Sequence, residues 1–310
     1  MTSPLPLAPQ ESEKLRDRFR GTLAGLAVGD ALGAPLEFQP ARDPAHYHTE
    51  MTGGGWLKLK PGEYTDDTQM TLATVESLLE RKVFDPDDIA RRFAAWFESS
   101  PADVGNHTRQ VLTDIRKGIG WEQASRSAQE ADPDSASNGS LMRCAPLALF
   151  FYRTPEHLPI LSPVLSQITH FHPDCQSACV ILNVTIALLL QGQTKENALA
   201  NAAITCPDAS QNLLERIENA HNSRVETSPS GWVLDTLEVA LWSLLHTASY
   251  EEAIVLGVNR GDDADTVGAV IGGLAGALYG FADIPERWLE PLQDRERLIE
   301  CADRLFTIAI

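Results

Sequence analysis

Residues 19–33 read FRGTLAGLAVGDALG, an apolar helical pattern with a glycine at every fourth position. These glycines share one face of such a helix, and they are Gly21, Gly25, Gly29 and Gly33. A glycine inside a helix costs about 1 kcal/mol relative to alanine, so four in register need a compensating gain. A face without side chains lets another helix approach closely, as some membrane helices do. Because the segment is short and flanked by polar residues, we expect this contact within a folded core.

A second glycine stripe lies near the C-terminal end of the chain, at Gly268, Gly272, Gly276 and Gly280. Acidic residues accompany both stripes. Asp30 stands on the apolar face of the first segment, beyond Leu26, and Asp263 and Asp265 directly precede the second. Close packing along the stripes would therefore gather acids from distant parts of the chain in one buried place.

Helical periodicity dominates the remaining sequence, and alternating strand patterns of useful length are nearly absent. We expect helices over residues 19–33, 70–80, 89–97, 141–151, 178–190, 232–246 and 267–279. The stretches between them are rich in turn residues, at 39–62, 98–106, 129–139 and 205–231. No linker or change of composition divides the chain. We predict one compact all-α domain over residues 1–310, with long functional loops at one end and a flexible N-terminus at 1–14.

The composition suits a folded protein with an acidic surface. Hydrophobic residues make up 43% of the 310, and 43 acidic against 25 basic side chains give a formal net charge of −18. Such an excess repels a phosphate backbone, so we expect no nucleic-acid partner. It makes a bound divalent cation plausible, although most of the acids must simply solvate the surface.

Cysteine usage and apolar runs bear on the compartment. The five cysteines are an odd number, which argues against a disulfide framework and for a reducing compartment. Residues 1–10 lack the basic and apolar regions of a secretion signal. The longest apolar run, 178–190, falls short of the roughly 20 residues that span a bilayer. We expect a cytoplasmic monomer without a membrane-spanning segment.

Two acidic clusters each precede an apolar helix: residues 63–68 read EYTDDT, and residues 261–266 read GDDADT. One interpretation is N-capping, which accounts for a single acid at each helix. It does not account for several adjacent carboxylates, which repel one another unless a cation neutralises them. A hard divalent cation takes carboxylate and hydroxyl oxygens together. Because neither cluster contains histidine, we expect two ions of Mg²⁺ or Mn²⁺ rather than zinc.

Four motifs, taken in order, resemble the ADP-ribosylglycohydrolase family. They are GLAVGDALG at 25–33, TDDT at 65–68, SNGSLMR at 137–143 and DADT at 263–266. The similarity covers nearly the whole chain, and the family includes the glycohydrolase that reactivates dinitrogenase reductase and the eukaryotic ADP-ribosyl hydrolases. The resemblance implies an orthogonal all-α fold with a cleft that holds a dinuclear Mg²⁺ or Mn²⁺ centre.

The resemblance also implies roles for individual acids. The implied metal ligands are Thr65, Asp66, Asp67, Asp263, Asp265 and Thr266, which leaves Asp262 without a role. The implied catalytic residues are Glu37, Asp103 and Asp66. Taken alone, Glu37 would be interpreted as an exposed loop acid, and Asp103 could belong to a plain turn. A carboxylate at Asp103 could also bind a guanidinium through two hydrogen bonds, or transfer a proton.

Substrate contacts are implied for ten residues: Asp30, Asn106, Thr108, Ser137, Asn138, Gly139, Ser140, Met142, His170 and Trp232. The backbone N–H groups of the turn 137–140 suit a diphosphate. Arg143 either adds charge there or is a buried structural arginine, and Trp232 either stacks on adenine or belongs to the core. A zinc site at His170, His172 and Cys175 fits no common ligand spacing.

Together these residues predict hydrolysis of an N- or O-glycosidic bond at C1″ of the distal ribose, releasing ADP-ribose from a protein or small-molecule substrate. The sequence Asp103-Val104-Gly105-Asn106 makes ADP-ribosyl-arginine the first choice, and O-linked, serine-type ADP-ribose the second. A non-catalytic ADP-ribose-binding module is the alternative from another class, and the intact acidic clusters disfavour it. Phosphoryl transfer would need a phosphate-binding motif such as a P-loop, which the sequence lacks.

Overall fold

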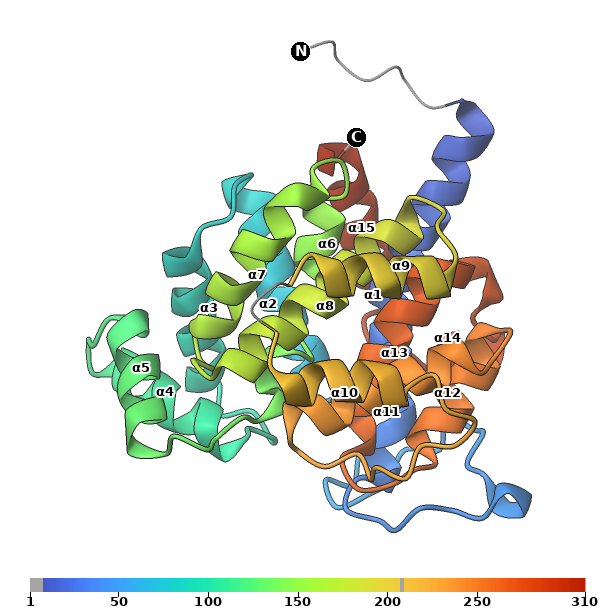
Figure 1. The fold of residues 1–310 in the computed structure, drawn as a ribbon, viewed down its shortest axis with the longest axis horizontal. Helices are drawn as coiled ribbons and strands as arrows, with labels where there is room; N and C mark the ends of the chain where they lie inside the picture. Colours follow the sequence, from blue (N-terminus) through green and yellow to red (C-terminus); the bar gives the residue numbers. More distant parts are fainter. Residues whose placement is uncertain (1–7, 207–208, 310) are drawn as a thin grey trace.

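The computed structural model describes residues 8–206 and 209–309, and these form an all-α structure (Figure 1). Apart from two isolated bridges, the described residues contain no strand, so the predicted fold class is confirmed. The helices are α1 (Pro9–Gly33), α2 (Asp66–Arg81), α3 (Pro86–Glu98), α4 (Asn106–Arg116), α5 (Trp121–Ala131), α6 (Pro146–Phe150), α7 (Leu158–Gln167), α8 (Pro173–Leu190), α9 (Lys195–Ile204), α10 (Gln211–Asn219), α11 (Val233–Leu245), α12 (Tyr250–Val258), α13 (Ala264–Tyr279), α14 (Glu286–Leu289) and α15 (Arg295–Ala309). Two 3₁₀ turns matter for the site, η1 (Ala34–Leu36) and η3 (Asn138–Ser140).

Helices α1 and α13 lie side by side at the centre of the molecule and run antiparallel (Figure 1). A Cβ added to Gly29 would lie 1.9 Å from the carbonyl oxygen of Gly268, and one added to Gly276 would lie 1.9 Å from that of Gly21. Only glycine permits such an approach. The two glycine stripes therefore pack against each other, which confirms the predicted close contact. Dispersion contacts between the two backbones offset the helical cost of the glycines.

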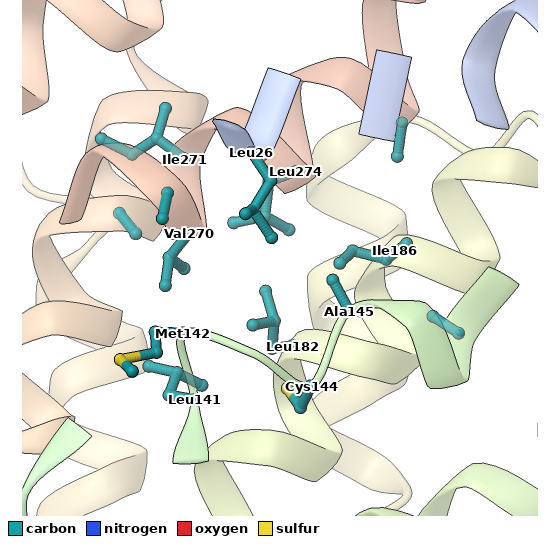
Figure 2. Close-up of a cluster of buried hydrophobic side chains, with 14 of the residues drawn as sticks. Leu26, Leu141, Met142, Cys144, Ala145, Leu182, Ile186, Val270, Ile271 and Leu274 are labelled. Carbon is teal, nitrogen blue, oxygen red and sulfur yellow. The ribbon is translucent and has the colours of Figure 1, made fainter. Parts of the chain in front are cut away.

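Side chains from other elements close over this central pair. Figure 2 shows Leu26 of α1 and Leu274 of α13 in one buried cluster with Leu182 and Ile186 of α8. Among the described residues, α8 is the one helix long and apolar enough to cross a membrane by length and composition. Its mean hydropathy is 1.5 over 18 residues, and 78% of that span is buried inside the protein. Burial in this core accounts for its apolar sequence.

Two expectations about local helices are wrong. In place of a helix over 141–151 the chain forms η3, a series of turns and the short helix α6, because Pro146 lacks an N–H and can only open a helix. The stretch 205–231, expected to be irregular, contains α10. Its N-cap Ser210 accepts a 3.1 Å hydrogen bond from the backbone N–H of Leu213. Leu213 and Ile217 form the buried face of α10, a helical spacing that the surrounding turn residues obscure.

The first helix begins before its apolar pattern does. Helix α1 starts at Pro9, inside the segment 1–14 that we expected to be flexible, and residues 1–7 lie outside the described residues. Arg16 and Arg20 both donate to the carboxylate of Asp303 on α15, at 2.6 to 2.8 Å. Besides these ion pairs, Leu15 is the buried apolar side chain of this extension, and one such residue makes no hydrophobic periodicity.

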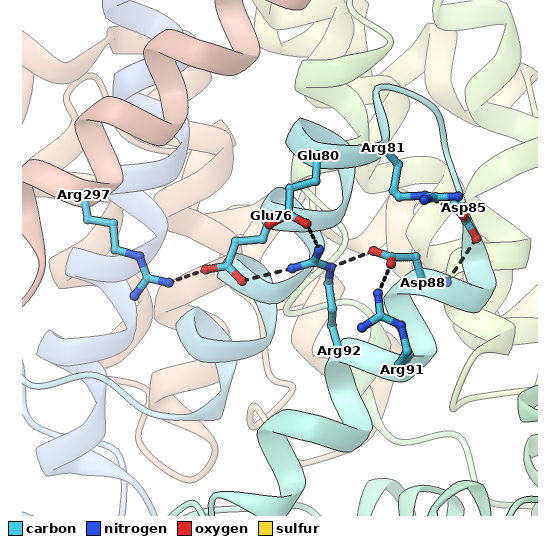
Figure 3. Close-up of polar contacts among 8 residues, drawn as sticks. All are labelled: Glu76, Glu80, Arg81, Asp85, Asp88, Arg91, Arg92 and Arg297. Carbon is cyan, nitrogen blue, oxygen red and sulfur yellow. Dashed lines mark hydrogen bonds and ion pairs between the residues drawn. The ribbon is translucent and has the colours of Figure 1, made fainter.

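A network of ion pairs joins α2, α3 and α15 (Figure 3). Arg92 of α3 donates to Asp88 at 2.6 Å and also pairs with Glu76 and Glu80 of α2. Arg297 of α15 binds Glu76 from the other side. Each of these three acids has a basic partner within the chain, so their charges serve packing.

Candidate active site

Four segments of the chain meet where α1 ends and α13 begins. Glu37 follows η1, Asp66 opens α2, Asp103 lies in the loop before α4, and Asp265 lies in the first turn of α13. The last glycine of the first stripe places these ends together, since a Cβ on Gly33 would lie 2.2 Å from the carbonyl oxygen of Ala264. The predicted gathering of acids by the glycine stripes is therefore confirmed.

Asp30 holds the start of helix α2. Its carboxylate is fully buried and accepts four hydrogen bonds, from the backbone N–H and hydroxyl of Thr65, both at 2.9 Å, and of Thr68, at 3.0 and 2.6 Å. Burial raises the pKa of Asp30 to about 6, although these hydrogen bonds oppose the rise. We expected Asp30 to contact substrate; in the structure α2 occupies both of its oxygens.

The N-capping interpretation of the acidic clusters does not match the structure. Thr65 is the N-cap of α2 and Asp263 that of α13, yet neither side chain accepts a hydrogen bond from its own helix backbone. At α2 the capping acceptor is Asp30, which comes from another helix. Asp67 Oδ2 lies 3.2 Å from the Thr65 hydroxyl, whereas Asp67 Oδ1 has no hydrogen-bond partner among the described residues.

Three carboxylates from separate segments converge. Oxygen atoms of Glu37, Asp103 and Asp265 all lie within 4.8 Å of one another, an arrangement that could hold a metal ion. Of the predicted metal ligands, Asp265 belongs to this group, and the other two members are the acids that we expected to be catalytic. Beside them Thr266 is buried, and its backbone N–H donates to Asp265 Oδ1 at 2.9 Å.

The carboxyl groups of this acidic site are buried close together, and their negative charges repel one another. Burial raises the pKa of Asp66, of Asp67 and of Asp265 well above the usual range, and the charges that add to the rise are those of neighbouring carboxylates. Burial also raises the pKa of Glu37 to about 8, and nearby acids contribute. Burial, then the charge of Asp263, raises the pKa of Asp103. The charge of Arg109 opposes the rise at Asp103, whereas the charges that act on Asp66, Asp67 and Asp265 are those of other acids.

The residues present fit a divalent cation. Asp67 Oδ1 is buried and has no hydrogen-bond partner among the described residues. A buried carboxylate oxygen without a donor is costly, and a hard cation would satisfy it. The surrounding groups offer only oxygen atoms, which suits Mg²⁺ or Mn²⁺.

Asp262 has a backbone role. Its side chain is exposed and its φ is 54°, a left-handed conformation that aspartate tolerates. Phe38 N–H donates to its carbonyl at 2.7 Å, and its own N–H donates to the carbonyl of Gln39 at 2.7 Å. These two bonds tie the segment after Glu37 to the segment before Asp263, so Asp262 joins two parts of the acidic site without lending it a carboxylate.

The turn 137–140 lies directly beside the acids. Asn138 Nδ2 donates to Asp263 Oδ2 at 3.0 Å and to Thr236 Oγ1 at 2.8 Å. A Cβ on Gly139 would lie 2.8 Å from the His170 ring, so glycine is required for this contact. The predicted substrate contacts Ser137, Asn138, Gly139 and His170 thus share one place.

Other predicted substrate contacts are distributed unevenly. Thr108 is buried next to Gly139, and Trp232 is half-buried and forms a bridge with Ser137. Asn106 is exposed at the start of α4. Ser140 is fully buried and accepts a 2.9 Å hydrogen bond from Ser166, and Met142 lies in the apolar cluster of Figure 2.

Sequence reasoning missed Trp56. Its indole Nε1–H donates to Glu37 Oε2, and its ring lies 5.7 Å from that of Phe38. Trp56 follows three glycines in the expected loop 39–62. A lone aromatic residue in a glycine-rich loop was the one feature of the sequence that could have pointed to a functional contact here. Glu37 itself is only 7% exposed, so its interpretation as an exposed loop acid is wrong.

A cavity of about 590 Å³ opens between α2, α3 and the segment before α15, and its lining does not include the converging acids. Tyr64 and Gln69, which flank the first acidic cluster, line it on one side. Ser99 and Pro101, which precede Asp103, line it on another. Glu76, Arg92 and Arg297 of the ion-pair network also line it, so this cavity is distinct from the acidic site.

Known proteins are similar to this chain in sequence and in structure. The sequence model described as ADP-ribosylglycohydrolase matches residues 11–309. The chain is 36% identical to the ADP-ribosylarginine hydrolase Tri1 of Serratia proteamaculans, with 100% of this chain and 84% of that protein covered. It is 37% identical to the ADP-ribosyl-(dinitrogen reductase) glycohydrolase of Rhodospirillum rubrum, covering 90% and 91%. A solved structure of an "ADP-ribosylglycohydrolase-related protein complex" superposes with a TM-score of 0.85 at 37% identity, covering 96% and 100%.

Proposed function

Since the chain belongs to the ADP-ribosylglycohydrolase family, we propose that it is a two-metal enzyme that releases ADP-ribose from ADP-ribosylated arginine. Glycohydrolase activity on ADP-ribosylated substrates follows from the family and the named relatives. Two relatives named ADP-ribosylarginine hydrolase, each 36% identical, support arginine as the acceptor. The convergence of Glu37, Asp103 and Asp265 is the observation that carries the mechanism.

The acids at the starts of α2 and α13 would hold the cations. Asp66, Asp67 and Asp265 are the buried carboxylates best suited, with Thr65, Asp263 and Thr266 beside them. When bound, Mg²⁺ or Mn²⁺ supplies fixed positive charge and lowers the pKa of a coordinated water. These acids are already close together before a cation binds, because they lie at the starts of α2 and α13.

Glu37 is suited to move a proton. Trp56 holds one of its oxygens, which orients the carboxyl group and leaves the other oxygen available. With a pKa raised to about 8, chiefly by burial, the carboxyl can keep a proton at neutral pH and give it to a leaving group. In this proposal Glu37 is the general acid and Asp103 its neighbour on the acceptor side.

Asp103 supports arginine as the acceptor. It is half-buried among other acids, and burial together with the charge of Asp263 raises its pKa. A guanidinium brings both the positive charge and the paired N–H groups that such a carboxylate lacks. The turn 137–140 would hold the diphosphate, and a protein or a small molecule could carry the modified group.

The test is a release assay with two substrates. Purified protein with Mg²⁺ or Mn²⁺ is incubated with ADP-ribosyl-arginine and ADP-ribosyl-serine peptides, and free ADP-ribose is measured. We expect metal-dependent release from arginine, abolished in Asp265→Asn and retained in the matched control Asp88→Asn, whose acid is paired with arginine.

Other outcomes would change the conclusion in distinct ways. Faster release from serine would overturn the arginine acceptor and leave the enzyme class intact. Tight ADP-ribose binding without turnover of either substrate would identify a binding module instead. Release that survives chelation of divalent cations would contradict the metal dependence.

A further inference from the structure

A charged group outside the acidic site is buried without a carboxylate partner among the described residues, and the groups that act on its charge are the thiols of Cys179 and Cys144. Arg143 is fully buried, and its one hydrogen bond runs from Nη2 to Thr169 Oγ1 at 2.6 Å. Its Nε and Nη1 atoms have no hydrogen-bond partner among the described residues, and the guanidinium lies 4.3 Å from the centre of the Phe93 ring. Burying a guanidinium without a carboxylate is costly, so a purely structural role explains it poorly.

Arg143 begins a chain of hydrogen bonds that ends at the turn 137–140. Thr169 Oγ1 lies 2.7 Å from His170 Nδ1, and His170 Nε2 lies 2.9 Å from Ser137 Oγ. Arg143, Thr169 and His170 are each at most 1% exposed, whereas Ser137 is partly exposed. The chain therefore connects a buried cation to a hydroxyl that a ligand can reach.

The guanidinium sets the direction of every bond in this chain. Arginine only donates, so Thr169 Oγ1 accepts from it. The Thr169 proton then goes to His170 Nδ1, because a buried hydroxyl needs an acceptor and no other is present among the described residues. With Nδ1 accepting, a neutral His170 carries its proton on Nε2 and donates it to Ser137 Oγ. The Ser137 proton is thereby left for a ligand.

The surroundings keep His170 neutral and its ring in place. Burial, then the charges of His107 and Arg143, hold the pKa of His170 well below its usual range. The ring of His107 lies 4.7 Å from that of His170. His107 Nε2–H donates to the Thr169 carbonyl at 3.0 Å, and the Ser135 hydroxyl donates to its Nδ1 at 3.2 Å. Both histidines thus have assigned donors and acceptors.

We propose that Arg143 is a positioning residue which, through Thr169 and His170, fixes the Ser137 hydroxyl as a hydrogen-bond donor to the diphosphate of ADP-ribose. This inference rests on the proposed function, in which the turn 137–140 holds the diphosphate. Diphosphate oxygens only accept hydrogen bonds. In the opposite direction, Ser137 would donate to His170 and turn a lone pair toward the anion.

The first measurement needs no ligand. Long-range ¹H–¹⁵N correlation spectra of the metal-free protein report which nitrogen of His170 carries the proton. We expect Nε2–H in the wild type and a mixture of tautomers in Thr169→Val, which removes the hydroxyl at nearly constant volume. A wild-type His170 protonated on Nδ1 would overturn the proposal whatever the substrate is.

The second measurement is ADP-ribose affinity by calorimetry with Mg²⁺ present. We expect Thr169→Val to weaken binding about tenfold and Thr169→Ser to restore it, because serine keeps the hydroxyl. Thr185→Val is the matched control, since Thr185 is also fully buried and its hydroxyl has no partner among the described residues. These variants avoid relying on Arg143→Met, which could fail to fold for unrelated reasons.

The outcomes separate this inference from the function on which it rests. Unchanged affinity in a folded Thr169→Val, or an equal loss in Thr185→Val, would overturn the positioning role while ADP-ribose binding stands. If the wild type binds no ADP-ribose, the proposed function fails, and with it the ligand assigned to Ser137. Tight binding of adenosine with the same tenfold loss in Thr169→Val would contradict the diphosphate as the recognised group.

Discussion

The two ends of helix α2 differ in how the negative charges of their acidic residues are neutralised. At its start, Asp66 and Asp67 lie among other carboxylates, and burial raises the pKa of each well above the usual range. Further along, Glu76 and Glu80 pair with Arg92, which also binds Asp88 (Figure 3). Burial by itself would raise the pKa of Asp88, yet hydrogen bonds from Arg92, Ser77 and Arg91 lower that pKa to about 2.

The difference shows which acids belong to the fold and which to function. Where charge serves packing, this chain supplies the cation from its own arginines. At the start of α2, the described residues provide no ion pair to Asp66 or Asp67, and the charges that act on these two acids are those of further acids. A cluster of buried carboxylates that repel one another is typical of a functional site, in which a bound ligand or cation supplies the positive charge.

The largest expected effect comes from removing a carboxylate at the uncompensated end. Asp66→Asn should lower kcat/KM for ADP-ribosyl-arginine by roughly a thousandfold, or about 4 kcal/mol, since a lost metal ligand removes charge stabilisation. The same variant should melt at a higher temperature than the wild type when both are metal-free, because one repelling charge is gone. Steady-state kinetics and calorimetric melting test the two halves, and a lower melting point would contradict the comparison.

The next effect is a pH dependence of stability. A pKa of about 8 in the fold means that Glu37 binds its proton more tightly in the folded than in the unfolded chain. Stability of the metal-free protein should therefore fall as pH rises from 6.5 to 8, by about 1.5 kcal/mol from this group. Urea unfolding in a chelator measures it.

One control sharpens that result. Glu37→Gln should reduce the pH slope, because the proton bound by Glu37 is then no longer lost over this range. A stability that rises over the same range in chelator would show that the raised pKa of Glu37 is wrong.

A smaller effect is expected at the compensated end. Asp88→Asn should destabilise the protein by about 1 kcal/mol, because it weakens charge-assisted hydrogen bonds to Arg91 and Arg92. Hydrolysis below the melting temperature should be unaffected, since Asp88 is not among the converging acids. Loss of activity without loss of stability would place Asp88 in the active site. It would contradict the distinction between arginine-paired acids that serve packing and unpaired acids that serve function.

The smallest effect is expected at the edge of the network. Arg297 and Glu76 are both about half-exposed, so their ion pair is screened by solvent. Arg297→Met should change the free energy of unfolding by less than about 0.5 kcal/mol. Denaturant titration at low and high salt tests this, and a larger, salt-insensitive loss would mean that the pair is effectively buried.

Much of this architecture was predictable because it depends on residue types at fixed spacing. The glycines at every fourth position predicted a close helix contact, and the acids beside them predicted a shared site. The motifs also placed Glu37 and Asp103 in that site, although nothing local distinguishes either from an ordinary loop acid. The helix expected over 141–151 was wrong because Pro146 outweighs its apolar pattern.

Other features depend on contacts that no local pattern contains. Trp56 reaches Glu37 from a loop, and Asp30 caps α2 from another helix. Asp262 pairs its backbone with Phe38 and Gln39, more than 200 positions away in the sequence, which its side chain does not reveal.

From the residues alone one can infer the helical class, the glycine contact and an oxygen-ligand cation site, because each follows from periodicity or from repulsion between adjacent charges. Only the folded chain shows that Arg92 neutralises one set of acids, while the charges that act on Asp66 and Asp67 are those of other acids. Likewise, only the fold connects Arg143 to Ser137 by hydrogen bonds through Thr169 and His170. The physical reason is that pKa values and hydrogen-bond directions are set by burial and by neighbours in space, not by neighbours in sequence.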